Sequence, residues 1–285
     1  MQPRVLLDGL AIGESPRWHD GRLWFSNWGT GEIIAVDLDG NSEVVGRGPD
    51  GLGWATNWLP DGRMLVCGPE LIRVAPDGSR VRHADLSDIS PYGWAEMTVD
   101  GRGNIYLDSI NFDFADFNDV MASGKTPGKI ALVTPDGEAR EVADGLAFPN
   151  GIVVTPDNTT LIVAESFAMR LTAFDIADDG TLSNRRAWAE GIAPDGITLD
   201  ADGCIWVSTA FGANDCARIR EGGEVLDRIQ LDRPCFASML GGPDRKTLFM
   251  LAAEWHGSEN VDEVIKARTG QLLVAEAPAP GVGWP

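Results

Sequence analysis

The segment ADGCIWVST at residues 201–209 decides the fold, because variants of it recur along the whole chain. Each variant joins a strand-like run, a tight turn and a second strand-like run. The others are WHDGRLWFSN (18–27), LPDGRMLVCG (59–68), DGRGNIYLDS (100–109), PDNTTLIVAES (156–166) and PDRKTLFMLAAE (243–254). The matching turn position is occupied, at spacings of 41 to 55 residues, by Gly21, Gly62, Gly103, Asn158, Gly203 and Arg245. Each variant therefore predicts a β-hairpin, since glycine and asparagine at such turns supply the positive φ that tight hairpins require.

A third short run follows most of these hairpins and ends in another turn. The third runs are GEIIAVDLDG (31–40), LIRVAPDG (71–78), GKIALVTPDG (128–137) and LTAFDIADDG (171–180). Apolar residues alternate with period two, and no long helical periodicity is present. A repeat of about 40–50 residues with about four strands is typical of a propeller blade. Six repeats predict an all-β fold, a single six-bladed β-propeller domain over residues 1–285, in which RVLLDG (4–9) completes the last blade.

Composition limits the function classes. The 285 residues are 44% apolar, and 43 acidic against 23 basic residues give a formal charge of -20. Such a field repels phosphate, so we expect no nucleic-acid partner. No apolar run approaches the length of a membrane span, and the first ten residues do not resemble a signal peptide, so we expect no membrane partner. We expect a cytoplasmic monomer or small homo-oligomer.

The cysteines and histidines do not form a recognisable site. Cys67, Cys204, Cys216 and Cys235 contain no CxxC pair, and their spacing from the three histidines does not match a zinc site. Reduced thiols are the expectation, with a Cys216–Cys235 bridge as the alternative. A GxSxG nucleophile motif is also missing from the sequence.

The longest spacing between repeats contains an insertion at about residues 109–128. It includes Phe112, Phe114 and Phe117, several acidic residues and a Gly- and Pro-containing end. An ordinary long loop is one interpretation. The other is a lid over the mouth of the propeller, because long loops in compact folds often carry function.

Aligning the repeats identifies the positions at the central channel. The first strand of each blade lines that channel, and the residue at its start is Asp195 in one blade, Asn150 in another and, within one residue, Glu14 in a third. Three oxygen-bearing side chains would then converge on one point and suit a hard divalent cation. Each residue also stands in an ordinary turn-forming sequence, so a purely structural role is the alternative.

Four motifs resemble the senescence marker protein (regucalcin) and gluconolactonase family. They are GESPRW (13–18), FPNGI (148–152), APDGI (193–197) and GGPDRKTLF (241–249), and the resemblance extends from about residue 7 to 257. It implies a six-bladed propeller with one divalent metal ion in the channel. It also implies Glu14, Asn150 and Asp195 as the metal ligands, with Asp195 as the general base.

The resemblance implies a metal-dependent lactonase that acts on a small lactone. The metal, calcium first with zinc, manganese or magnesium as alternatives, would polarise the carbonyl while Asp195 activates water. A carboxylate bound to a metal is a poorer base, so a hydroxide on the metal is the alternative nucleophile. Two other functions stay open. One is a propeller enzyme for cyclisation, dehydration or phosphotriester hydrolysis, and the other is a calcium-binding regulatory protein without turnover.

One position departs from the family pattern. Relatives often have an asparagine where this chain has Ala95, followed by Glu96. Either water fills the missing ligand position or Glu96 substitutes for it. The arginine that some lactonases have just upstream is also unmatched, because Gly93 and Trp94 stand there.

The second strand of each blade returns to the same face, where its last residues would form an outer ring. The ring residues are Asn27, Asp108, Glu165, Ser208 and Glu254. Of these we expect Asp108 and Glu165, together with Glu96, to contact substrate; the alternative is that ring residues only support loops. An apolar wall could come from Trp28, Trp54, Trp94, Phe112 and Phe148, with Trp94 and Phe148 as substrate contacts. Aromatic residues that fill the space between blades are the other possibility.

Overall fold

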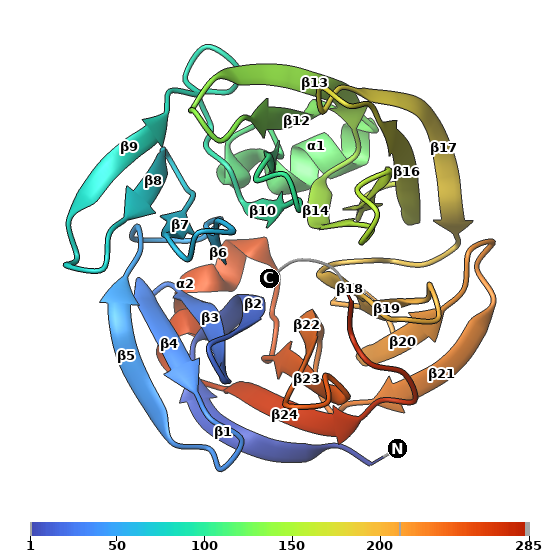
Figure 1. Cartoon of the computed structure of the whole chain (residues 1–285). Helices are drawn as coiled ribbons and strands as arrows, with labels where there is room; N and C mark the ends of the chain where they lie inside the picture. Colours follow the sequence, from blue (N-terminus) through green and yellow to red (C-terminus); the bar gives the residue numbers. More distant parts are fainter. Residues whose placement is uncertain (1, 211, 283–285) are drawn as a thin grey trace.

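Six four-stranded sheets form a ring around a central axis in the computed structural model, which describes residues 2–210 and 212–282. Figure 1 shows the first strand of each blade nearest the centre and the fourth at the rim. Neighbouring strands in every sheet are antiparallel. The predicted six-bladed all-β propeller is confirmed.

The first three blades follow one another along the chain. Blade 1 comprises β2 (Ile12–His19), β3 (Arg22–Trp28), β4 (Glu32–Val36) and β5 (Ser42–Arg47). Blade 2 comprises β6 (Thr56–Trp58), β7 (Met64–Val66), β8 (Leu71–Val74) and β9 (Arg80–Ala84). Blade 3 comprises β10 (Glu96–Val99), β11 (Ile105–Ser109), β12 (Gly128–Val133) and β13 (Ala139–Leu146).

The other three blades close the ring. Blade 4 comprises β14 (Pro149–Val154), β15 (Thr160–Glu165), β16 (Arg170–Ile176) and β17 (Leu182–Glu190). Blade 5 comprises β18 (Ile197–Leu199), β19 (Ile205–Ser208), β20 (Asp215–Ile219) and β21 (Val225–Gln230). Blade 6 comprises β22 (Cys235–Gly241), β23 (Thr247–Ala252), β24 (Gly270–Glu276) and, from the start of the chain, β1 (Arg4–Leu10).

The recurring turn residues have the backbone conformation that the repeats predicted. A positive φ is found at all six matched positions: Gly21, Gly62, Gly103, Asn158, Gly203 and Arg245. In the first hairpin Asp20 also has a φ of 49°, so both central residues of that turn lie in the left-handed region. Local turn chemistry thus sets the register of each inner hairpin.

The first strand of the chain completes the last blade, as predicted. β1 pairs antiparallel with β24, with Arg4 opposite Val274 and Leu10 opposite Gly270. Leu10 is buried, and Leu6 and Leu7 pack against a cluster that includes residues of blade 1 and blade 6. The two ends of the propeller are therefore joined by strand pairing and by shared core.

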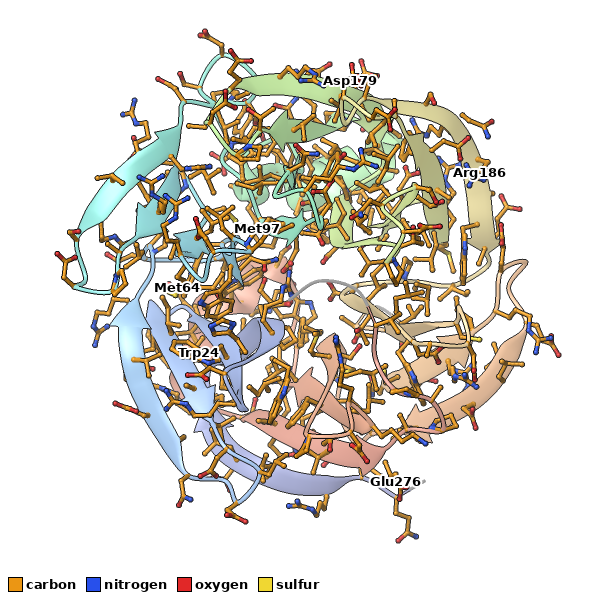
Figure 2. All side chains as sticks on the ribbon, viewed as in Figure 1. Trp24, Met64, Met97, Asp179, Arg186 and Glu276 are labelled. Atoms are coloured by element: carbon orange, nitrogen blue, oxygen red, sulfur yellow. The ribbon has the colours of Figure 1, made fainter. Side chains whose placement is uncertain are left out.

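The hydrophobic core is divided into layers between neighbouring blades. One such layer joins Leu65 and Leu71 of blade 2 to Met97 and Leu107 of blade 3. Figure 2 shows side chains filling the spaces between sheets, with Met97 near the axis. All four cysteines are buried and free, so the alternative disulfide is not formed.

Two insertions carry the helices of the described residues. The first follows β11 and contains the 3-10 turn η1 (Phe114–Asp116) and helix α1 (Phe117–Ser123), which ends at Gly124 in the left-handed conformation. The second follows β23 and contains η2 (Ser258–Asn260) and helix α2 (Val261–Ala267). Within the described ranges, no helix combines the length and the apolar character needed to cross a membrane.

Candidate active site

A cavity of about 330 Å³ opens at the end of the propeller where the inner strands begin. Its lining includes the three predicted metal ligands, Glu14, Asn150 and Asp195. These residues come from blade 1, blade 4 and the start of blade 5, so the ring brings together side chains that lie far apart in the sequence. The three side chains therefore line one cavity.

Close packing at the axis explains the glycines that follow two of these residues. A Cβ atom at Gly151 would lie 2.5 Å from the backbone nitrogen of Ile197, and one at Gly196 would lie 2.8 Å from the Cα atom of Ala237. Both distances are shorter than real contacts, so only glycine lets neighbouring inner strands approach this closely. The Asn-Gly and Asp-Gly pairs hold Asn150 and Asp195 at that contact.

Glu14 is directed by a kink in β2. The strand pairing with β3 is irregular between Glu14 and Arg17, and Ser15 has a φ of 49°. Residues other than glycine rarely occupy this left-handed region, and surrounding structure must hold them there. A similar kink precedes Asn150, because Phe148 has a φ of 58° and the pairing of β14 shifts after Pro149.

Glu96 is a third buried carboxyl in the cavity, and two neighbouring side chains hold it in place. The Ser15 hydroxyl donates a hydrogen bond to its Oε1 atom, and Arg17 lies 3.6 Å from its Oε2 atom. Arg17 also donates to the backbone carbonyl of Met97 at 2.6 Å, which anchors the guanidinium under the site. Glu96 thus lines the cavity next to Ala95.

The three buried carboxyls destabilise one another's charged forms. Burial raises the pKa of Glu14 well above its usual value, and the charges of Asp195 and Glu96 raise it further. Burial and then the charge of Glu96 raise the pKa of Asp195 in the same way. Burial also raises the pKa of Glu96, although Arg17 and Ser15 act in the opposite direction. A cation placed among these groups would relieve the repulsion.

The donor set fits a hard divalent cation. Glu14 and Asp195 offer carboxylate oxygens, and Asn150 offers an amide oxygen that already accepts from the Gly151 N–H at 2.9 Å and retains a second lone pair. Oxygen donors of this kind suit calcium or magnesium. No three histidine, cysteine or carboxylate side chains among the described residues are spaced to hold a metal alone, so the set depends on Asn150.

Glu165 does not contact the cavity, which corrects its expected role in substrate binding. Its side chain is fully buried and its Oε1 atom accepts hydrogen bonds from Thr172 at 2.5 Å and from Arg170 at 2.8 Å. Arg185 approaches the same oxygen at 3.1 Å. The other oxygen accepts from the Ala147 N–H at 2.8 Å. Glu165 therefore supports the turn that precedes Asn150.

Asp108 is likewise absent from the residues that line the cavity. It is fully buried opposite Glu96 in the pairing of β10 with β11, and burial followed by the charge of Glu96 raises its pKa. Its position in β11, opposite Glu96, therefore does not bring it into the lining of the cavity. The other outer-ring residues, Asn27, Ser208 and Glu254, also lie outside the lining.

The apolar wall contains most of the aromatic residues that the sequence indicated. Trp28, Trp94, Phe112 and Phe148 line the cavity, whereas Trp54 is fully buried between blades. The insertion contributes further rings, because Phe114 and Phe117 are part of the same lining. Its predicted position at the mouth is therefore observed.

Two wall residues, Phe236 and Trp255, were missed by the sequence analysis. Phe236 is the second residue of β22, the innermost strand of blade 6, so the repeat alignment could have located it. Trp255 belongs to the second insertion, whose helix packs Val264 and Ile265 against Ile12 and Phe236. The spacing of the sequence repeats does not predict that Trp255 lines the cavity.

Comparison with known proteins agrees with this fold. The SMP-30/Gluconolactonase/LRE-like region matches residues 12–254, so the chain belongs to this family. A pentonolactonase from Haloferax volcanii is 22% identical over 268 residues, covering 91% of this chain and 88% of the relative. Diisopropyl-fluorophosphatase from Loligo vulgaris is 25% identical over 246 residues, covering 79% and 77%.

Solved structures show the same architecture. A luciferin-regenerating enzyme superposes with a TM-score of 0.80 at 18% identity, covering 99% of this chain and 98% of its own. A calcium-binding protein, regucalcin, from Agrobacterium tumefaciens gives a TM-score of 0.79 at 20% identity, covering 99% and 96%. At these identities the likeness concerns the fold.

Proposed function

We propose that the protein is a hydrolase that opens lactones or related esters with one divalent cation, for which calcium is the best match. The observation that carries the proposal is the meeting of Glu14, Asn150 and Asp195 from three blades in one cavity. Membership of a family with gluconolactonase in its description, and a relative named pentonolactonase, support this reaction class.

We assign separate roles in metal binding and water activation to the polar residues of the cavity. A divalent cation held by Glu14, Asn150 and Asp195 would supply Lewis acidity to the carbonyl oxygen of the substrate. Asp195 is the group we propose to orient the attacking water and accept its proton. Glu96, fixed by Ser15 and Arg17, adds a second carboxyl that can orient the same water. The surrounding aromatic side chains exclude other water.

The test is a panel of lactones with calcium, manganese or zinc, before and after treatment with a chelator. Turnover should disappear with chelator and return with metal. Asp195→Asn should lower kcat by at least about 100-fold, the typical size of a general-base contribution. Asp157→Asn changes an exposed aspartate in a distant turn and should retain wild-type turnover. Full turnover by Asp195→Asn in chelator would refute the proposal.

Titration calorimetry separates the two roles of Asp195. If Asp195→Asn binds calcium like the wild type but has lost turnover, the carboxylate acts as the base. If calcium binding is lost as well, it acts as a ligand. Calcium binding by the wild type with no turnover of any ester would instead support a regulatory calcium-binding protein.

Hydrolysis of neutral phosphotriesters is a second candidate. The relative named diisopropyl-fluorophosphatase covers 79% of this chain, and the described lining contains no basic side chain that an anionic phosphate would require. A neutral dialkyl aryl phosphate should be included in the panel. Faster turnover of this triester than of every lactone would make phosphotriester hydrolysis the primary activity.

A further inference from the structure

The wall of the cavity is dominated by aromatic rings that are packed before any ligand arrives. Nine of its 21 lining residues are aromatic. Phe117 lies 5.4 Å from both Phe114 and Phe148, and Phe148 stacks on Phe167 at 4.5 Å. Rings held in this way present an apolar surface without further ordering, which favours ligands that bury apolar area.

A second group of aromatic residues in the lining comprises Trp28, Phe236 and Trp255. Phe236 packs edge-on against Trp255 at 5.8 Å. The indole N–H of Trp28 donates to the backbone carbonyl of Trp54 at 2.6 Å, so this donor is already used. Phe236 therefore offers contact area without a polar atom, and the indole N–H of Trp28 is not free for a hydroxyl group of a ligand.

The charges of the lining disfavour anionic ligands. Its charged side chains are four carboxylic acids, Glu14, Glu96, Asp113 and Asp195, and the described lining contains no lysine, arginine or histidine. Arg17 lies beneath Glu96 and is engaged there and with Met97. A bound divalent cation would offset part of this charge but would leave no basic group to pair with a carboxylate or phosphate of a substrate.

The carboxyl and amide partners for the hydroxyl groups of a sugar lie at the candidate metal site, apart from Asp113. Serine, threonine and glutamine are absent from the described lining, and Ala95 adds no polar side-chain atom. Asp113 is exposed at the rim and already accepts from the Ala115 N–H at 2.9 Å, and Tyr92 is 55% exposed. A hydroxyl placed against the aromatic wall loses water without replacement, which lowers affinity.

We infer that the substrates are uncharged and largely apolar, with an aromatic ring or alkyl chain beside the reacting ester or lactone. We expect polyhydroxylated and anionic lactones to have a lower kcat/KM than these apolar substrates. This inference rests on the proposed function, because it concerns the same cavity. It deepens that function by naming the substrate class.

The first experiment compares kcat/KM for matched neutral substrates in the presence of calcium. The aromatic lactone dihydrocoumarin and γ-lactones with successively longer alkyl chains are set against glucono-δ-lactone. Each added methylene should raise kcat/KM about fourfold until the cavity is filled. The sugar lactone should be slower than dihydrocoumarin by at least about 100-fold.

A matched pair of variants assigns the preference to the wall. Phe114→Ala should lower kcat/KM for dihydrocoumarin about tenfold, mainly through KM, and leave γ-butyrolactone nearly unchanged. Met121→Ala alters a residue of α1 that is 50% exposed and outside the lining, and should change neither substrate.

A binding measurement keeps this inference separate from catalysis. The lactam analogue of dihydrocoumarin is titrated while tryptophan fluorescence is recorded, with the lactam of gluconic acid as the polar comparison. Binding of the aromatic lactam without turnover of any ester would refute the proposed function and retain the ligand class. Turnover of glucono-δ-lactone at the same or higher kcat/KM would retain the function and refute the ligand class. Failure of both binding and turnover would refute both.

Discussion

Ala95 is a small residue in the lining of the cavity that contains the carboxyls of Glu14, Glu96 and Asp195. Ala95 lines the cavity immediately before Glu96, and the Cβ atom that Gly53 lacks would lie 3.9 Å from the Ala95 side chain. Because Ala95 lines the cavity, we expect a larger polar side chain at this position to extend into the cavity.

Ala95→Asn should tighten calcium binding and raise kcat/KM for sugar lactones, because the amide adds an oxygen donor and a partner for a hydroxyl group. We expect an increase of about tenfold in either quantity, the size of one added hydrogen bond to a charged or polar partner. Calorimetry and lactone kinetics measure it. Ala95→Val is the control for added volume. If the asparagine variant matches the wild type in both measurements, the ligand position is already filled by another group.

Glu165→Gln should destabilise the protein at neutral pH. Burial acts to raise the pKa of Glu165, but hydrogen bonds from Thr172 and the Ala147 N–H, together with Arg170 and Arg185, lower it overall. The carboxylate therefore stabilises the fold above its unfolded pKa of about 4.3, and this stabilisation is lost as the pH falls through the lower folded value. We expect a loss of about 1–3 kcal/mol in the free energy of unfolding at pH 7.

Urea denaturation at pH 7 and in the acid range checks this expectation. The difference between wild type and Glu165→Gln should shrink once the pH is below the folded pKa. Glu141→Gln, which breaks a part-exposed pair with Lys129, should change the free energy by no more than about 0.5 kcal/mol. A constant difference at all pH values would show that packing, and not charge, explains the effect.

Among the elements, the insertion that carries α1 has the most direct connection to substrate choice. The insertion connects β11 to β12, and these two strands pair along their whole length, from Ile105 opposite Val133 to Ser109 opposite Lys129. Phe112, Phe114 and Phe117 then reach the cavity. Because the strand pairing on both sides of this connection is regular, we expect that the insertion can change without disturbing the ring.

Replacing residues 113–126 by a short Gly-Ser linker should change KM and substrate preference more than stability. Loop closure costs only about 0.6 kcal/mol per doubling of length. The lost ring packing should lower Tm by a few degrees at most, about 2–4 °C per kcal/mol for a chain of this size. Kinetics on the lactone panel and thermal melts measure both. Asn118→Ala with Met121→Ala is the control, since both residues are exposed. An unchanged substrate profile would refute a lid.

Across the whole molecule, stability depends on closing the ring. Blade 6 takes three strands from the end of the chain and its outermost strand from the beginning. The core layer around Leu23 and Phe249 includes Leu10, with Leu6 and Leu7 packed against it. Removing β1 would expose one sheet edge and part of that layer.

A chain that begins at Leu10 should melt about 10 °C below the full chain, because the lost leucine burial is worth several kcal/mol and each kcal/mol corresponds to about 2–4 °C. Circular dichroism during heating measures the shift. A chain that begins at Arg4 retains β1 and should melt at the wild-type temperature. Equal melting of both truncated chains would mean that β1 does not stabilise the closed ring.

The sequence by itself determined the six-bladed fold, because its signals are local. Hairpin turns need positive φ within a few residues, and the alternation of apolar residues is read along one strand. The same repeat alignment placed Glu14, Asn150 and Asp195 at one end of the channel. A position within a repeat is sufficient to predict where a strand begins.

Only the tertiary structure decided which side chains reach the open space. Glu165 and Asp108 occupy the aligned strand ends, yet one is held by arginines of its own blade and the other lies opposite Glu96. Phe236 and Trp255 line the cavity because blade 6 and the second insertion are packed beside it. Such contacts depend on how segments far apart in the chain pack against one another, and no local sequence pattern encodes this. The repeats therefore predict the position of the site, whereas packing decides which side chains form its wall.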